Sequence, residues 1–298
     1  MQRILATSIL LFTLLGSNTY AQTQLQYKLK IGDSIAVHQK ANQKITQDID
    51  GTKHEMTNIL ESKFVLAVKT VTDSSYILDF TYKLFKLQSN SNLYGEIMSI
   101  NTDEPIENGD TEAAIFSGLT QSKLKIELLK TGDIISVRGT TRLINNMMKH
   151  AGIEDEFTKQ IMIEEMKKEF GSQSLSDSFE QFTFIYPSKK VAVNDSWENT
   201  YSGELEAKNT WTLKALSPSI DILGTAYISL ESVEENYTMI LEGEQKTLIS
   251  ADIKTGIVKT MSVTSKTQGN TVSLQNNSVK IPTTINSVTT YKTKLYVQ

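Results

Sequence analysis

Alternation of apolar and polar side chains with a period of two is the feature that most constrains the fold of this chain. Within residues 35–45, 76–84 and 124–128, apolar side chains recur at even spacing. That period places apolar side chains on one face of a strand and polar ones on the other. The dipeptide Asp50-Gly51 stands between two long runs of this kind and predicts a tight hairpin. The first half of the chain is therefore expected to form antiparallel sheet with one face covered.

The apolar period changes to three and four between residues 140 and 181, which predicts helices. A first helix is expected to be capped by Thr140 or Thr141, and a second is expected to end at Gly171. The residues expected to face inward are Leu143, Ile144, Met147, Met148 and Ala151 in the first helix, and Phe157, Ile161, Met162, Met166 and Phe170 in the second. Weaker patterns predict a helix over residues 111–119, behind Asp110, and a short helical turn over 175–182.

Strand patterns return after residue 181, beginning with residues 182–186 and including separate runs over 237–241 and 248–253. Strands, then helices, then strands are typical of an α+β protein. We therefore predict a mainly antiparallel sheet, either a curved sheet or a half-barrel, with a helical segment near residues 140–181. The predicted parts are a leader over 1–21, a β-rich half over 22–139, the helical segment over 140–181 and a second β-rich half over 182–298.

Two pairs of turn sequences recur in the two β-rich halves. Ile31-Gly32-Asp33-Ser34-Ile35 is similar to Val193-Asn194-Asp195-Ser196-Trp197, and Lys130-Thr131-Gly132-Asp133-Ile134 is similar to Lys254-Thr255-Gly256-Ile257-Val258. In each half an Asp-Ser turn comes first and a Lys-Thr-Gly turn comes late, but the spacings differ. Both interpretations stay open: a degenerate duplication with insertions in the first half, and a chance similarity of turn-forming residues.

The N-terminus has the order of segments found in a secretory signal peptide. Arg3 supplies a positive charge, residues 4–15 form an apolar run, and Ala21 is the small residue expected before the cleavage site. As a helix, that run would span only about 18 Å, short of the roughly 30 Å hydrocarbon core that a membrane anchor must cross. We expect cleavage between Ala21 and Gln22.

The chain contains no cysteine, which excludes lipid attachment at a lipobox, disulfides and thiolate metal sites. An exported chain without cysteine is expected in the periplasm or outside a Gram-negative bacterium. Its 34 acidic and 30 basic side chains give a net charge of −4, so nucleic acid is not an expected partner. No apolar run after residue 21 is long enough to span a membrane, so the mature chain is expected to lack a transmembrane span.

No motif for catalysis, cofactor binding or metal binding is found in the sequence. The three histidines, His38, His54 and His150, lie far apart, and Asn58 stands where a zincin would carry its second histidine. A phosphate-binding glycine-rich loop and a nucleophile elbow are also missing. We therefore predict no enzymatic activity, no cofactor, and no catalytic or metal-binding residue.

Two groups of residues are candidates for ligand binding. Gln39, Gln43 and Gln47 share a strand face with apolar residues, a mixture that suits a wet groove, although an exposed outer strand would show the same pattern. The second group is a set of methionines on the predicted helices. Their flexible side chains would either hold variable apolar ligands or fill a core. This group consists of Met147, Met148, Met162 and Met166.

The turns also carry a resemblance to a known family. Residues 25–33, the spaced glutamines, Lys130-Thr131-Gly132, and the segment 193–197 after Pro187 resemble a family of secreted bacterial proteins of unknown function. The resemblance covers nearly all of the mature chain and implies no activity and no site residue. Asn194 stands where the family pattern usually has glycine; Asn tolerates the left-handed conformation, so the turn is expected to survive.

The expected architecture resembles that of the periplasmic lipoprotein carriers, in which a half-barrel covered by helices holds acyl chains. This resemblance implies a non-enzymatic protein that binds a lipid, another apolar ligand or an envelope component. The alternative is a structural or adhesive envelope module that binds protein partners through sheet edges, and a hydrolase without a recognisable motif is the third. An apolar pocket of roughly several hundred Å³ under the helices would favour a carrier, and a packed interior would favour the structural module.

Overall fold

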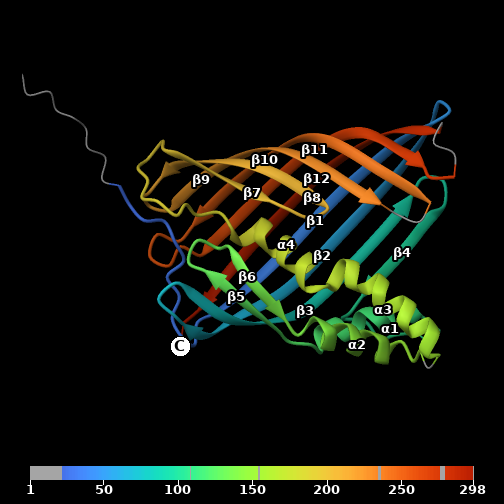
Figure 1. Cartoon of the computed structure of the whole chain (residues 1–298), viewed down its shortest axis with the longest axis horizontal. Helices are drawn as coiled ribbons and strands as arrows, with labels where there is room; N and C mark the ends of the chain where they lie inside the picture. The colour runs from blue at the N-terminus through green and yellow to red at the C-terminus, as the bar shows by residue number, and fades with distance from the viewer. Residues whose placement is uncertain (1–21, 108, 154, 234–235, 276–278, 298) are drawn as a thin grey trace, which may run out of the picture.

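The computed structural model of the chain describes residues 22–107, 109–153, 155–233, 236–275 and 279–297 (Figure 1). These residues form one curved antiparallel sheet of 12 strands with four helices, which confirms the predicted α+β fold. The strands are β1 (Ser34–Ile49), β2 (Thr52–Val71), β3 (Ser75–Ser91), β4 (Gly95–Asn101), β5 (Leu124–Leu129), β6 (Ile134–Arg138), β7 (Ser196–Tyr201), β8 (Leu205–Ala215), β9 (Ile220–Val233), β10 (Tyr237–Ala251), β11 (Val258–Ser273) and β12 (Lys280–Tyr296). The helices are α1 (Thr111–Thr120), α2 (Thr140–His150), α3 (Glu156–Phe170) and α4 (Ser172–Thr183).

The sheet joins the two β-rich halves through the first and the last strand. Its order is β6-β5-β3-β2-β1-β12-β11-β10-β9-β8-β7, with β4 paired to β3 outside this path. The predicted hairpin is confirmed, because Ile49 pairs with Thr52 across Asp50 and Gly51, which both have positive φ. Two residues of this conformation match the twist of the flanking strands.

One face of the sheet, called here the inner face, is covered in part by α4 (Figure 1). This helix contacts both edge strands, β6 and β7. The ring of Phe179 lies 4.8 Å from that of Phe80, and the ring of Phe182 lies 4.7 Å from that of Tyr291. The cavity that remains beneath the end of α4 has a volume of only about 20 Å³. This part of the inner face is therefore a packed core.

The helices begin and end near the predicted positions, but two details of the prediction are wrong. Gly139, with φ 97°, is the N-cap of α2, and neither Thr140 nor Thr141 caps it. Phe157 and Ile161 are 73% and 50% exposed, although both were expected to face inward. The helix α3 packs on α2 and α4 rather than on the sheet. The apolar residues of α3 cover a wider part of its circumference than α2 and α4 contact, so some of them stay exposed to solvent.

Two strand predictions are also wrong. Residues 182–186 do not form a strand, because α4 continues to Thr183 and side chains bind the backbone that follows. Asn199 Nδ2 and Tyr201 Oη donate to the carbonyl oxygen of Phe184, at 2.6 and 3.0 Å. The separate strands expected over 237–241 and 248–253 are one strand, β10, because the polar stretch between them keeps the period of two.

The two Asp-Ser turns have the same geometry. Gly32 and Asn194 have φ of 94° and 75°, so the turn tolerates asparagine as expected. The Asp33 carboxylate accepts a hydrogen bond from the backbone N–H of Lys30, and the Asp195 carboxylate accepts one from Ala192, both at 2.8 Å. Each turn opens a meander of five antiparallel strands, β1-β2-β3-β5-β6 and β7-β8-β9-β10-β11.

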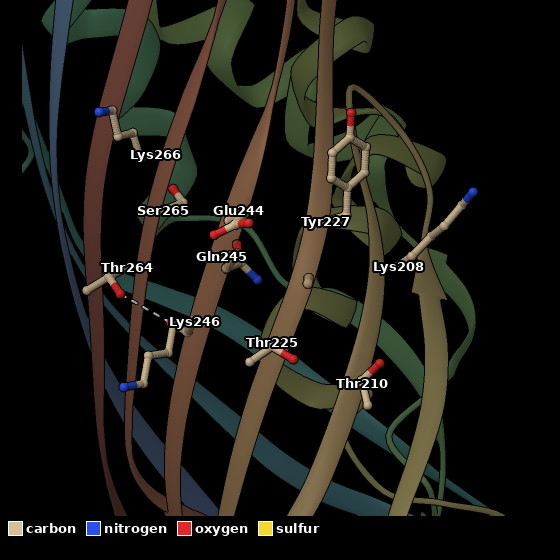
Figure 2. A pocket seen from close by; sticks show the side chains of 11 residues that line it. Lys208, Thr210, Thr225, Tyr227, Glu244, Gln245, Lys246, Thr264, Ser265 and Lys266 are labelled. Carbon is tan, nitrogen blue, oxygen red and sulfur yellow. Dashed lines mark hydrogen bonds between the residues drawn. The ribbon is translucent and has the colours of Figure 1, made fainter.

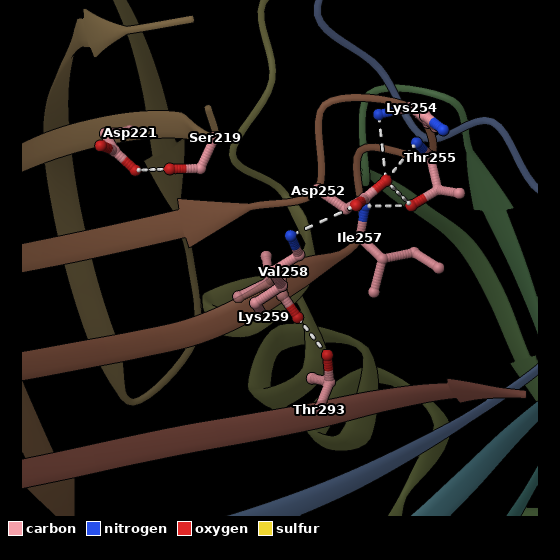
Figure 3. Close-up of polar contacts among 9 residues, drawn as sticks. All are labelled: Ser219, Asp221, Asp252, Lys254, Thr255, Ile257, Val258, Lys259 and Thr293. Carbon is pink, nitrogen blue, oxygen red and sulfur yellow. Dashed lines mark hydrogen bonds and ion pairs between the residues drawn. The ribbon is translucent and has the colours of Figure 1, made fainter. Parts of the chain in front are cut away.

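The Lys-Thr-Gly turns lie between the fourth and fifth strands of these meanders. In the second turn, shown in Figure 3, the Asp252 carboxylate accepts hydrogen bonds from the backbone of Lys254 and Thr255 and pairs with Lys259 at 3.3 Å. Burial alone would raise the pKa of Asp252, but these hydrogen bonds hold it below its usual value. In the first meander, β4 and α1 are inserted before the fourth strand, which explains the unequal spacing of the turns.

The predicted leader, residues 1–21, lies outside the described residues. Within the described part of the chain, none of the helices combines the length and the apolar character needed to cross a membrane.

Candidate functional site

Charge separates the two faces of the sheet. Among the described strand residues that are paired in register, no Lys, Arg, Asp or Glu side chain lies on the inner face. On β1, for example, Lys40 and Lys44 point to the outer face, where Lys44 pairs with Glu55 at 2.8 Å. His54 is the one histidine among the inner strand residues, and it is buried. Burying an unpaired charge is costly, so an uncharged face suits the exclusion of water by something apolar.

A groove of about 400 Å³ lies on the inner face beyond the packed core. Its apolar lining comes from β1, β2, β3 and β4 and consists of Ala41, Leu60, Leu87, Ile97 and Met98. Its polar lining consists of Gln43, Asn58, Ser89 and Ser287. The space expected under the helices is thus absent beneath α4 and is found further along the same face of the sheet.

The three predicted glutamines all lie on the inner face, half-buried, at every fourth position of β1. Gln39 accepts from Ser62 Oγ at 3.1 Å and donates to Tyr291 Oη at 3.3 Å. Gln47 lies within 3.3 Å of His54 Nδ1 and donates to Thr271 Oγ1 at 3.4 Å. Only Gln43 lines the groove. The other two glutamines hold neighbouring strands together across the inner face.

The predicted methionines lie elsewhere. Met147 and Met148 of α2 have no exposed surface and belong to the hydrophobic core. Met162 and Met166 of α3 are half-buried and pack against that core. None of the four lines the groove. The structure therefore does not bring the two groups of candidate residues together, and ligand binding by these methionines stays a prediction.

Three polar residues of the groove were not singled out as ligand-binding candidates from the sequence: Asn58, Ser89 and Ser287. Asn58 could have been found, because a two-residue turn at Asp50-Gly51 pairs Gln43 with position 58. Ser89 and Ser287 depend on the pairing of β2 with β3 and of β1 with β12. No local signal in the sequence indicates the register of the last strand against the first.

The outer face carries a wider and shallower hollow of about 820 Å³ over β8 to β11. Figure 2 shows Lys208 of β8, Lys246 of β10 and Lys266 of β11 around it, with Glu244 between them. Its charged side chains are exposed, and the hydrogen bond drawn there joins Thr264 Oγ1 to the Lys246 carbonyl at 3.4 Å. This hollow lacks the convergent apolar walls that a small-molecule site usually has.

The titratable side chains do not assemble into a metal site. His38 on the outer face lies 2.6 Å from Glu61, and His150 contacts the backbone carbonyl of Asn146 at 2.7 Å. Within the described ranges, no group of three or more His, Asp or Glu side chains could hold a metal ion. The predictions that the chain has no catalytic residue and no cofactor stay predictions.

The chain matches one family model, described as "Family of unknown function (DUF6263)", over residues 73–258. It has no significant match among curated proteins. A solved structure of lipid–protein interactions in lipovitellin is similar, with 9% identity and a TM-score of 0.53 over 90% of this chain and 26% of that one. The chain thus spans about a quarter of the lipovitellin chain, and the likeness shows a shared fold. An outer membrane channel from Pseudomonas putida F1 matches with 8% identity and a TM-score of 0.26, over 90% of this chain and 98% of the channel.

Proposed function

This chain belongs to DUF6263, a family of unknown function, and we propose that it is a non-enzymatic protein that binds an apolar or amphiphilic ligand on the inner face of its sheet. The observation that carries this proposal is the separation of charge between the faces. An inner face without Lys, Arg, Asp or Glu is maintained along strands whose outer face carries charged residues such as Lys40, Lys44 and Glu55. A face in contact only with water would have no need of this restriction.

The form of the groove supports the same proposal. Its lining residues are half-buried or exposed, so the space between them is open to a ligand. It combines leucine side chains with a few amide and hydroxyl groups, which is the composition of small-molecule sites in proteins. Covering Leu60 and Leu87 would contribute roughly 25 cal/mol for each Å² of apolar surface removed from water.

The comparison with lipovitellin adds a second support, since the solved structure of that protein concerns its interactions with lipid. A signal peptide over residues 1–21 would export the chain, and its ligand would then be an apolar component of the cell envelope. A purely structural module is the competing proposal, and it predicts no binding at the groove.

The test measures the fluorescence of N-phenylnaphthylamine, an uncharged amphiphilic dye, during titration with the purified mature chain. Leu60→Lys places a charge in the groove, and we expect it to weaken dye binding by about tenfold or more because the ammonium must be dehydrated or displaces the dye. The matched control is Ile59→Lys, one residue away on the outer face, where the side chain is 43% exposed. We expect this control to bind as the wild type does.

Leu60→Trp provides a second variant if Leu60→Lys does not fold, because the larger ring fills the groove without adding charge. Binding that is absent in the wild type, or unaffected by both Leu60 variants, would contradict the proposal and favour the structural module. Circular dichroism of each variant establishes that it is folded before binding is compared.

A further inference from the structure

Two neighbouring rows of inner-face residues run across β1, β2 and β3 at the groove, one apolar and one polar. The pairing register places Leu87, Leu60 and Ala41 side by side on β3, β2 and β1. The next inward position along each strand is polar, and this row consists of Ser89, Asn58, Gln43, Ser287, Ser265 and Gln245. The groove lies over both rows. An occupant would therefore meet an apolar strip and a polar strip about 7 Å apart, two residues along a strand.

The hydrogen bonds of the polar row all point in one direction. Ser89 Oγ donates to Asn58 Oδ1 at 2.7 Å, and Asn58 Nδ2 donates to Gln43 Oε1 at 2.9 Å. The chain of donors ends at Gln43 Nε2, which has no acceptor among the described residues. Gln39 and Gln47 differ, because the Nε2 of each donates to a neighbouring hydroxyl. A donor at the end of such a chain is polarised by the hydrogen bonds that precede it. Among the three glutamines of β1, Gln43 is therefore the one whose Nε2 offers a strengthened donor to a ligand.

The same row shows a second shortage of acceptors. Through Gln245 and Ala226 the register continues to Asn209 on β8. Asn209 is only 3% exposed, and its Nδ2 has no hydrogen-bond partner in the part of the chain that the structure describes. A buried donor without an acceptor is costly. Asn209 does not line the groove, so within the groove it is Gln43 Nε2 that suits an occupant bringing an oxygen acceptor.

The charge of the inner face limits which acceptors fit. A fatty acid or a phospholipid would bring a carboxylate or a phosphate, and such anions in proteins are usually held by Arg or Lys. The inner side chains of the described strands include neither, and the lysines of β1 lie on the other face. An uncharged carbonyl oxygen needs only an N–H donor, which Gln43 supplies.

From these rows, and resting on the proposed function, we infer that the inner face binds an uncharged acyl ester in preference to a fatty acid or an alkyl amine. The ester carbonyl oxygen accepts from Gln43 Nε2, and the acyl chain lies along Ala41, Leu60 and Leu87. The hydroxyl groups of the row bind the remaining oxygens of the head group. No bond is made or broken in this interaction.

The experiment displaces bound N-phenylnaphthylamine with three competitors that carry the same type of long unsaturated hydrocarbon chain: mono-oleoylglycerol, oleate and oleylamine. It is carried out at about pH 8, where a carboxyl group is ionised and an alkyl amine is protonated. We expect mono-oleoylglycerol to displace the dye from the wild type at a concentration about tenfold lower than either charged competitor. Equal or better displacement by oleate would overturn the inference, whereas a dye that does not bind at all would overturn the proposed function itself.

Two substitutions of Gln43 locate the selectivity. Gln43→Met keeps the length of the side chain and removes the donor, so we expect weaker displacement by mono-oleoylglycerol with unchanged dye affinity. Gln43→Lys supplies a cation, so we expect oleate to become the better competitor. The matched controls, Asn42→Met and Asn42→Lys, alter the exposed outer face of the same strand and should keep the wild-type order. If the three competitors displace the dye from both Gln43 variants as they do from the wild type, the assignment of Gln43 is contradicted. If Gln43→Lys does not fold, Gln43→Met alone provides the test.

Discussion

Glu180 of α4 shows how a single residue ties the helix to the edge of the sheet. Its Oε1 accepts a hydrogen bond from the backbone N–H of Ile134 on β6 at 3.3 Å. Burial, together with the nearby carboxylates of Asp133 and Asp177, raises the pKa of Glu180 to about 7, against the lowering effect of the Ile134 N–H. The folded state therefore holds a proton that the unfolded chain, with an ordinary Glu pKa of about 4.3, releases at lower pH.

We predict that this group makes the protein less stable as the pH rises. The folded state binds the proton more tightly, so the stabilisation is complete below the ordinary pKa of glutamate and is lost as the pH rises through about 7. Glu180→Gln keeps the acceptor oxygen without the charge, and we expect the free energy of unfolding to lose this decline. Urea denaturation, repeated from about pH 5 to about pH 8 in steps of about half a pH unit, measures the free energy of unfolding at each pH. The control Glu206→Gln, on the outer face, should keep the decline of the wild type. If the decline also persists in Glu180→Gln, another titratable group must cause it.

At the scale of elements, α3 is the helix whose contribution was least predictable. Its apolar residues have helical spacing, yet none of its described residues is fully buried. Met162, Met166 and Phe170 are partly buried against the core, whereas Phe157 and Ile161 are exposed to solvent. In contrast, α2 buries Leu143, Ile144, Met147 and Met148 completely. The two helices should therefore differ strongly in how much each apolar side chain stabilises the fold.

We expect Met147→Ala to lower the free energy of unfolding by about 2–5 kcal/mol, because it leaves a cavity in a packed core. Ile161→Ala should cost less than about 1 kcal/mol, since half of that side chain already meets water. Chemical denaturation of both variants under one set of conditions compares them directly. A similar loss in the two variants would mean that the exposed face of α3 is covered in solution.

At the scale of the whole molecule, the repeated turns divide the sheet into two meanders with a shared hydrogen-bond pattern. Gly32 N–H donates to the Val68 carbonyl at 3.1 Å, and Asn194 N–H donates to the Leu213 carbonyl at 2.8 Å. The segments before the two meanders meet at Tyr27 and Tyr186, whose rings are 5.1 Å apart at 73°. The shared pattern favours the duplication among the two interpretations of the sequence, with β12 added to close the contact between β11 and β1.

The two turns should contribute unequally to stability despite their equal geometry. Asp33 is 4% exposed and Asp195 lies in solvent. Loss of a carboxylate from a buried turn leaves an unsatisfied N–H, so Asp33→Ala should cost about 1–3 kcal/mol and Asp195→Ala about 1 kcal/mol or less. Because the turns lie in different meanders, the double variant should show the sum of the two losses. Equilibrium denaturation of the single and double variants measures this, and a loss well above the sum would show that the meanders are coupled through the turns.

The sequence by itself determined that the chain forms a mainly antiparallel sheet, the faces of β1 and the hairpin at Asp50-Gly51. These follow from a period of two and from backbone conformations that few residues adopt, and both are local properties. Even the pairing of Gln43 with Asn58 follows from that hairpin, because a two-residue turn leaves one register for the strands it joins.

Tertiary structure alone decided the groove and the exposed side of α3. Gln43 meets Ser287 only because the last strand pairs with the first, at a register that depends on the fit of two whole meanders. The apolar residues of α3 have one period, but which of them are covered depends on the neighbours that α3 meets. Side-chain periodicity indicates which residues share a face, whereas the partner of that face is chosen by packing between segments distant in the chain.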